Sequence, residues 1–125
     1  MTMQGDQRFA WVCGSDGPLS ALLTDVLGEA GVSVVTGASP EDVDLILLHV
    51  SGPPALERIE RLSHRERPQI PIVAVLPFAD EELARSALNA GARVTYALGT
   101  PLSVLKTAIA HALASRAAPG PERDR

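Results

Sequence analysis

Residues 70–98, IPIVAVLPFADEELARSALNAGARVTYAL, contain the pattern that decides the fold. The segment begins with an apolar run, residues 70–76, which has almost no polar alternation and is typical of a strand buried on both faces. A predicted helix follows, with Asp80 as its N-cap and Gly91 at its end. A second predicted strand, residues 94–98, completes a strand–helix–strand unit, and units of this kind favour a parallel sheet.

The same alternation of strands and helices extends through the rest of the chain. Strands are predicted at residues 9–13, 32–36 and 45–50, and helices at 18–30, around 56–62 and from 101 onward. One helix is marked by a continuous apolar stripe that Gly31 closes: Leu19, Leu22, Leu23, Val26, Leu27 and Ala30. The helix that begins at Asp80 is predicted to continue through Leu83, Ala84, Ala87 and Leu88. The inward face of the last helix is predicted at Leu102, Leu105, Ile109 and Leu113. We therefore predict an α/β fold with a parallel sheet of five strands and helices on both faces.

The connection between the second and third predicted strands is unusually short. It comprises residues 37–44, and when fully extended these reach about 26 Å. The connection must cross the first strand and return along it, a diagonal of about 18 Å. A helix rises only ~1.5 Å per residue, so we predict that the helix at this point is shortened or absent. We also expect the sheet over Val12 and Leu47 to be thinly covered, which leaves apolar surface for a partner.

Composition limits the functions that the chain can have. Its 125 residues are enough for one ordinary domain, and 46% hydrophobic with 21% charged residues indicates a globular protein. A net charge of -4 argues against direct binding of nucleic acid, which needs clustered Lys and Arg. The densest basic run is Arg58, Arg61, Arg65 and Arg67, interrupted by Glu57, Glu60 and Glu66. We interpret this run as the solvated face of a helix.

Terminal segments and cysteine content indicate the cellular location. Cys13 is the single cysteine, so an internal disulfide is impossible. Residues 1–8 lack the apolar region of a secretory signal, and no apolar run is long enough to span a bilayer. We expect a cytoplasmic protein without membrane insertion, with a disordered N-terminus at 1–8, one domain at 9–116, and a disordered tail or linker at 117–125.

Residues 70–98 resemble the fourth strand, fourth helix and fifth strand of the receiver domains of bacterial response regulators. The likeness includes the AGA turn at 90–92 and an aromatic residue, Tyr96, in the fifth strand. The stretch DLILLHVSGP, residues 44–53, is similar to the third strand and the loop after it. The resemblance extends from Phe9 to about Leu113 and implies a domain of two-component signal transduction. It also implies a doubly wound, five-stranded parallel sheet of order 2-1-3-4-5, which is a flavodoxin-like topology. Atypical members of the family occur in transcription regulators and in pilus-assembly ATPases of the Tad/Cpa type.

The family's chemistry is transfer of a phosphoryl group to an aspartate. It requires an adjacent pair of carboxylates for Mg²⁺, the acceptor aspartate, a Ser or Thr, and a Lys. Matched residue by residue, these five positions are occupied by Gly14, Ser15, His49, Pro77 and Gly99. All five differ from the family's pattern, and Asp16 is the only carboxylate nearby. The resemblance therefore implies a degenerate, non-phosphorylatable receiver that is not an enzyme and uses neither a metal nor another cofactor.

Two residues near this position have alternative interpretations. His49 has no second ligand at metal-binding spacing, because His64 and His111 lie on separate predicted helices, and we interpret it as filling the vacated pocket. Residues 13–17, CGSDG, also resemble the phosphocysteine loop of phosphotransferase-system IIB proteins. A helix N-terminus lowers a thiol pKa and binds anions, so a phosphocarrier using Cys13 is the alternative function. A cysteine in a buried strand, however, is usually a small core residue.

The resemblance also indicates where partners bind. Receivers often dimerise or dock through the face formed by the fourth helix, the fifth strand and the last helix. Here the residues predicted on that face are Arg85, Asn89, Arg93, Tyr96 and Lys106, and they can equally be ordinary solvated residues. We expect a protein partner or a second copy of the chain. The predicted function is a phosphorylation-independent protein–protein interaction or dimerisation module in bacterial signal transduction or transcriptional regulation.

Overall fold

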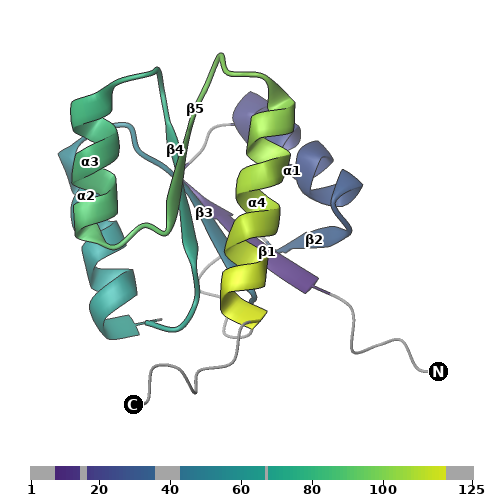
Figure 1. Ribbon diagram of the computed structural model, residues 1–125, viewed down its shortest axis with the longest axis horizontal. Coiled ribbons are helices and arrows are strands. Elements are labelled where there is room, and N and C mark those ends of the chain that lie inside the picture. The colour runs from purple at the N-terminus through teal and green to yellow at the C-terminus, as the bar shows by residue number, and fades with distance from the viewer. Residues whose placement is uncertain (1–7, 15–16, 36–42, 67, 118–125) are drawn as a thin grey trace.

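The computed structural model describes residues 8–14, 17–35, 43–66 and 68–117, which form an α/β domain built on one sheet (Figure 1). Its five parallel strands are β1 (Arg8–Cys13), β2 (Val32–Val35), β3 (Leu45–His49), β4 (Ile72–Leu76) and β5 (Val94–Ala97). Their order across the sheet is β2-β1-β3-β4-β5. The predicted fold class and strand order are thus confirmed.

Helices cover both faces of the sheet. Figure 1 shows α1 (Gly17–Glu29) and α4 (Leu102–Ala117) on one face, and α2 (Pro53–Arg61) and α3 (Glu81–Ala90) on the other. A π-helical turn, η2 (Leu62–Glu66), continues α2 toward its C-terminal end. Within the described residues, no helix is both long and apolar enough to cross a bilayer.

Two hydrophobic cores lie on opposite faces of the sheet, because successive side chains of a strand point to opposite faces. The core under α1 and α4 contains Ala10 and Val12 of β1. The core under α2 and α3 contains Trp11 and Cys13 of the same strand. The three central strands are buried on both faces, as their unbroken apolar runs predict.

The predicted thin cover over Val12 and Leu47 is wrong. Val12 is 9% exposed and Leu47 is fully buried, and both lie in the core under α1 and α4. The reason is the handedness of the connections. By the right-handed rule for crossovers between parallel strands, a connection from β2 to β3 is expected on the face opposite to α1. Its length is therefore not expected to affect the cover of Val12 and Leu47.

The predicted shortening of the helix concerns residues 37–44, of which 37–42 lie outside the described residues. The last two, Val43 and Asp44, lead directly into β3. Val43 is buried, and the Asp44 carboxylate accepts a hydrogen bond from the Phe9 backbone N–H at 3.0 Å. The Asp44 N–H in turn donates to the Phe9 carbonyl oxygen at 2.8 Å. This reciprocal pair fixes the start of β3 beside β1.

The ends of α3 follow the sequence signals. Asp80 is the N-cap, and its Oδ1 accepts hydrogen bonds from the N–H groups of Glu82 and Leu83 at 3.0 and 3.2 Å. Gly91 ends the helix with φ 127°, a conformation that L side chains rarely adopt. Both predicted caps are confirmed.

Candidate functional site

The carboxyl ends of the parallel strands meet at one edge of the sheet, where ligands of open α/β folds usually bind. Gly14 directly follows β1, His49 ends β3, Pro77 directly follows β4, and Gly99 lies two residues beyond β5. The structure therefore brings these four predicted pocket positions to the same edge. The other two, at positions 15 and 16, lie outside the described residues.

His49 connects β3 to the end of β1. Its Nδ1 lies 3.3 Å from the Gly14 carbonyl oxygen, so the imidazole donates a hydrogen bond in the tautomer that carries the proton on Nδ1. Gly14 has φ 77°, and a Cβ at this position would lie 3.1 Å from the His49 carbonyl oxygen. The Nε2 atom of His49 is buried and makes no hydrogen bond among the described residues. The side chain at the predicted acceptor position is thus an imidazole held against β1.

The other two described positions carry no group that could bind a phosphate through a side chain. Pro77 has neither a hydroxyl nor a backbone N–H, and Gly99 has φ 94°, which favours glycine. The backbone between them is ordinary sheet, since the Leu98 N–H donates to the Leu76 carbonyl oxygen at 2.9 Å. Across the described ranges, no group of three or more His, Cys, Asp or Glu side chains is placed to hold a metal ion.

Cys13 lies in the core under α2 and α3 and not at a surface. It is 8% exposed, and burial raises the pKa of its thiol, with a smaller opposing effect from the Arg58 guanidinium. A nucleophilic cysteine needs an accessible thiolate and a lowered pKa. The geometry is therefore unfavourable to a phosphocarrier that uses Cys13.

The five residues predicted on the interaction face do not form one cluster. Arg85 and Asn89 are exposed on α3, and Arg93 is exposed just before β5. Lys106 of α4 turns toward α1, where its Nζ lies 2.5 Å from Oε1 of Glu29. The prediction that these residues bind a partner is therefore best restricted to the three on the α3 side.

Tyr96, the fifth of these residues, is 3% exposed and packs in the core with residues of α4. Its hydroxyl donates to the Thr100 carbonyl oxygen, and burial raises its pKa. Its placement on the surface is corrected accordingly, because the pleat of β5 directs this side chain inward. Tyr96 packs on the α4 side of the sheet and does not present itself to a partner.

Exposed apolar side chains on α3 and α4 were missed by the periodicity argument. Leu102, predicted to face inward, is 40% exposed, and Leu88 and Val104 are 46% and 43% exposed. On α3 only Ala87 is fully buried, so the true inward stripe runs through small residues beside Leu88. A longer wheel analysis centred on Ala87 would have placed Leu88 outside.

Comparisons with known proteins identify the fold. A scan of protein families finds no match, and a search of curated proteins finds none either. Among solved structures, a response regulator from Thermotoga maritima superposes with a TM-score of 0.75 at 18% identity, covering 86% of this chain and 98% of that one. A pilus assembly-related protein from Burkholderia pseudomallei superposes with a TM-score of 0.73 at 21% identity, and the match covers 92% of this chain and 95% of that one.

A third similar structure is a LuxR family DNA-binding response regulator from Silicibacter pomeroyi. Its TM-score is 0.72 at 24% identity, and the match covers 86% of this chain and 92% of that one. At these identities the likeness shows the fold alone. The chain has the fold of response-regulator receiver domains.

Proposed function

We propose that this domain is a phosphorylation-independent pseudo-receiver that acts through protein–protein contacts, as an interaction or dimerisation module in bacterial signal transduction or transcriptional regulation. We further propose that it works in the cytoplasm and without catalysis. One observation carries the proposal: in a receiver fold, the residue at the end of β3 is His49, hydrogen-bonded to Gly14.

The chemistry of phosphoryl transfer supports this reading. Transfer to a carboxylate requires an oxygen nucleophile together with cations that offset the charge on the transferring group. An imidazole replaces the nucleophile at His49, while Pro77 and Gly99 supply neither a hydroxyl nor an ammonium group. A phosphorylated histidine at this place would need the same cations, and Gly14, Pro77 and Gly99 provide none through their side chains.

We assign partner binding to the surface of α3 and the start of β5, named here the α3 face and defined by Arg85, Asn89 and Arg93. The exposed Leu88 lies on the same helix, and an apolar side chain within a polar rim is typical of interaction surfaces. The names of the similar structures supply two settings for such a module, pilus assembly and DNA-binding regulation.

A phosphodonor experiment tests the absence of phosphoryl chemistry. The protein is incubated with acetyl phosphate and Mg²⁺, and separately with beryllofluoride and Mg²⁺, beside an ordinary receiver domain as the positive control. We expect an unchanged intact mass and unchanged amide resonances at Gly14 and His49. A stoichiometric phosphoryl adduct, or an ordered shift of those resonances with millimolar Mg²⁺, would overturn the proposal.

A two-hybrid screen for partners tests the assignment to the α3 face. The variant Arg85→Glu with Arg93→Glu reverses two charges on this face, and Lys106→Glu reverses one that faces α1. We expect partners of the wild-type domain to be lost with the first variant and retained with the second. Equal retention by both variants would move partner binding to another surface.

A further inference from the structure

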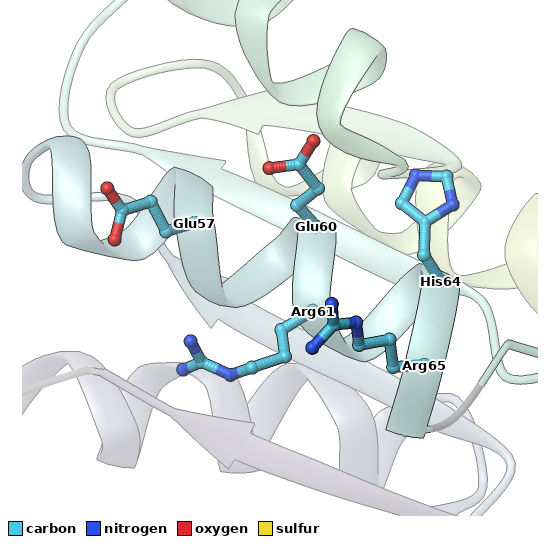
Figure 2. A pocket seen from close by; sticks show the side chains of 5 residues that line it. All are labelled: Glu57, Glu60, Arg61, His64 and Arg65. Carbon is cyan, nitrogen blue, oxygen red and sulfur yellow. The ribbon is translucent and has the colours of Figure 1, made fainter.

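The helical segment formed by α2 and η2 carries a continuous stripe of charged side chains. Five of them line one hollow of about 460 Å³: Glu57, Glu60, Arg61, His64 and Arg65 (Figure 2). Their spacing of i, i+3, i+4, i+7 and i+8 places them on one side of a helix, and all five are exposed. We call this set the charged stripe.

The charges of the stripe are separated by sign in two directions. Along the helix, the two glutamates precede the two arginines. Across the helix, Figure 2 shows Glu60 and His64 on one side and Arg61 and Arg65 on the other. The stripe therefore presents the Glu60 carboxylate beside a basic edge formed by Arg61 and Arg65, with Glu57 at its N-terminal end.

Most of these charges remain available for a partner. Arg61 has one ion pair, in which its Nε lies 3.5 Å from Oε2 of Glu66, and both side chains are about half exposed. Within the described ranges, Glu57, Glu60 and Arg65 form no ion pair. Glu57 and Arg61 are four residues apart, a spacing that often gives a pair on a helix, yet they are not paired here.

We infer that the charged stripe is a contact between two copies of this chain. A two-fold axis that runs parallel to the helix sets Glu60 of one copy against the basic edge of the other, and repeats the contact with the roles exchanged. Because this axis places equal heights along the helix opposite each other, the contact relies on the separation of charge across the helix. A stripe of one sign would instead repel its copy. Nucleic acid or a purely acidic peptide would meet Arg61 and Arg65 but would be repelled by Glu57 and Glu60.

The contact between the two stripes is expected to be weak, because it consists mainly of exposed ion pairs. Such pairs add little affinity each, and they determine the register and the choice of partner more than the binding free energy. A second hollow beside the stripe, between α2 and α3, includes the half-buried Leu56 and Ala90, which add some apolar surface. We expect a weak dimer that is largely dissociated at about 0.5 M NaCl, because salt screens exposed charges.

This inference rests on the proposed function in one respect only, that the domain acts through protein contacts. It does not use the pocket at the carboxyl edge, and of the α3 face it borders only Asn89, which lines the second hollow. A charge-swap experiment tests it with two double variants. Glu57→Arg with Glu60→Arg makes the stripe wholly basic, and Arg61→Glu with Arg65→Glu makes it predominantly acidic.

Sedimentation equilibrium measures each variant alone and the equimolar mixture. We expect each variant to associate at least about tenfold more weakly than the wild type, and the mixture to form a heterodimer at least as tight as the wild-type dimer. The matched control is Arg85→Glu with Arg93→Glu, which makes the same two substitutions on the α3 face and should leave self-association unchanged. Far-UV circular dichroism melting curves verify that every variant is folded.

Each contrary outcome bears on one proposal. A wild-type chain that stays monomeric at millimolar concentration overturns the inference, and so does a dimer that survives both reversals. Loss of the dimer in the control variant would place self-association on the α3 face, again overturning the inference while leaving the proposed function intact. A phosphoryl adduct found together with a successful charge swap would overturn the proposed function alone.

Discussion

At Gly91, the addition of a single methyl group by Gly91→Ala should strongly lower the free energy of unfolding. It ends α3 with φ 127° and ψ 2°, and a Cβ built on it would lie 2.0 Å from Oγ and 2.5 Å from Cβ of Ser63 in η2. The Ser63 hydroxyl donates to the Ala90 carbonyl oxygen at 3.0 Å, so it caps the end of α3 at the same point. Gly91→Ala therefore imposes a strained backbone and also displaces η2.

The expected loss can be built from these contacts. A non-glycine residue in such a conformation costs about 1–3 kcal/mol. Displacing Ser63 removes its hydrogen bond to Ala90, which adds about 1 kcal/mol. Alanine restricts the unfolded chain more than glycine does, and this offsets about 0.4–1 kcal/mol of the lost stability. The net prediction is a decrease of about 1–4 kcal/mol in the free energy of unfolding, which corresponds to a fall in Tm of roughly 4–15 °C for a domain of this size.

Urea denaturation provides the assay, followed by circular dichroism and by the fluorescence of Trp11, the single tryptophan, which is 5% exposed. The matched control is Gly28→Ala, the same change on exposed α1, where a Cβ meets nothing within 4 Å. This control should be neutral or stabilising by up to about 1 kcal/mol. Adding Ser63→Gly to Gly91→Ala removes the overlap but not the backbone strain, and so separates the two causes. A Gly91→Ala protein as stable as the wild type would refute the reasoning.

Three further outcomes follow from single contacts. Asp80→Ala removes the side chain that caps α3 and should lower the free energy of unfolding by about 1 kcal/mol in urea titrations. Asp80→Ser should keep most of this stability, because serine also caps helices. Burial raises the pKa of the Cys13 thiol, so the folded chain holds this proton more tightly than the unfolded chain, and the free energy of unfolding should fall as the pH rises above about 9. Cys13→Ala should make this fall with pH less steep, and an equally steep fall in the variant would contradict the assignment. His49→Asp alone should not restore phosphorylation by acetyl phosphate in intact mass spectra, and it should destabilise the fold, because a carboxylate cannot donate to the Gly14 carbonyl oxygen.

The fold could be predicted because its signals are local. The apolar runs of β1, β3 and β4 identify buried strands, and Asp80 and Gly91 mark the ends of α3 through their own backbone chemistry. Strand order follows from the resemblance and from the alternation of elements. None of these signals depends on which face of the sheet a side chain occupies.

The orientation of individual side chains was harder to predict, because local signals do not indicate the face of the sheet to which a side chain points. A strand buried on both faces has no polar alternation, so its sequence does not indicate which residues share a face. This degeneracy hides which core Val12 and Leu47 join, and the handedness of the connection then decides which face it crosses. Tyr96 was expected on the surface because the resemblance put it on the interaction face, whereas the pleat of β5 directs it inward. Lys106 differs, since its turn toward Glu29 depends on α1 packing beside α4, which is a tertiary arrangement.

The two proposed surfaces have a common consequence for regulation. A signal that shifts a two-state equilibrium must interact differently with the two states, and the charge of a phosphoryl group is the usual source of that difference in receivers. With His49 in place of an acceptor carboxylate, this source is missing from the proposed mechanism. Occupancy of the α3 face and of the charged stripe should then follow mass action, so that protein concentration and ionic strength determine the fraction bound. Such a module responds to the amount of the protein and its partner and not to a phosphodonor.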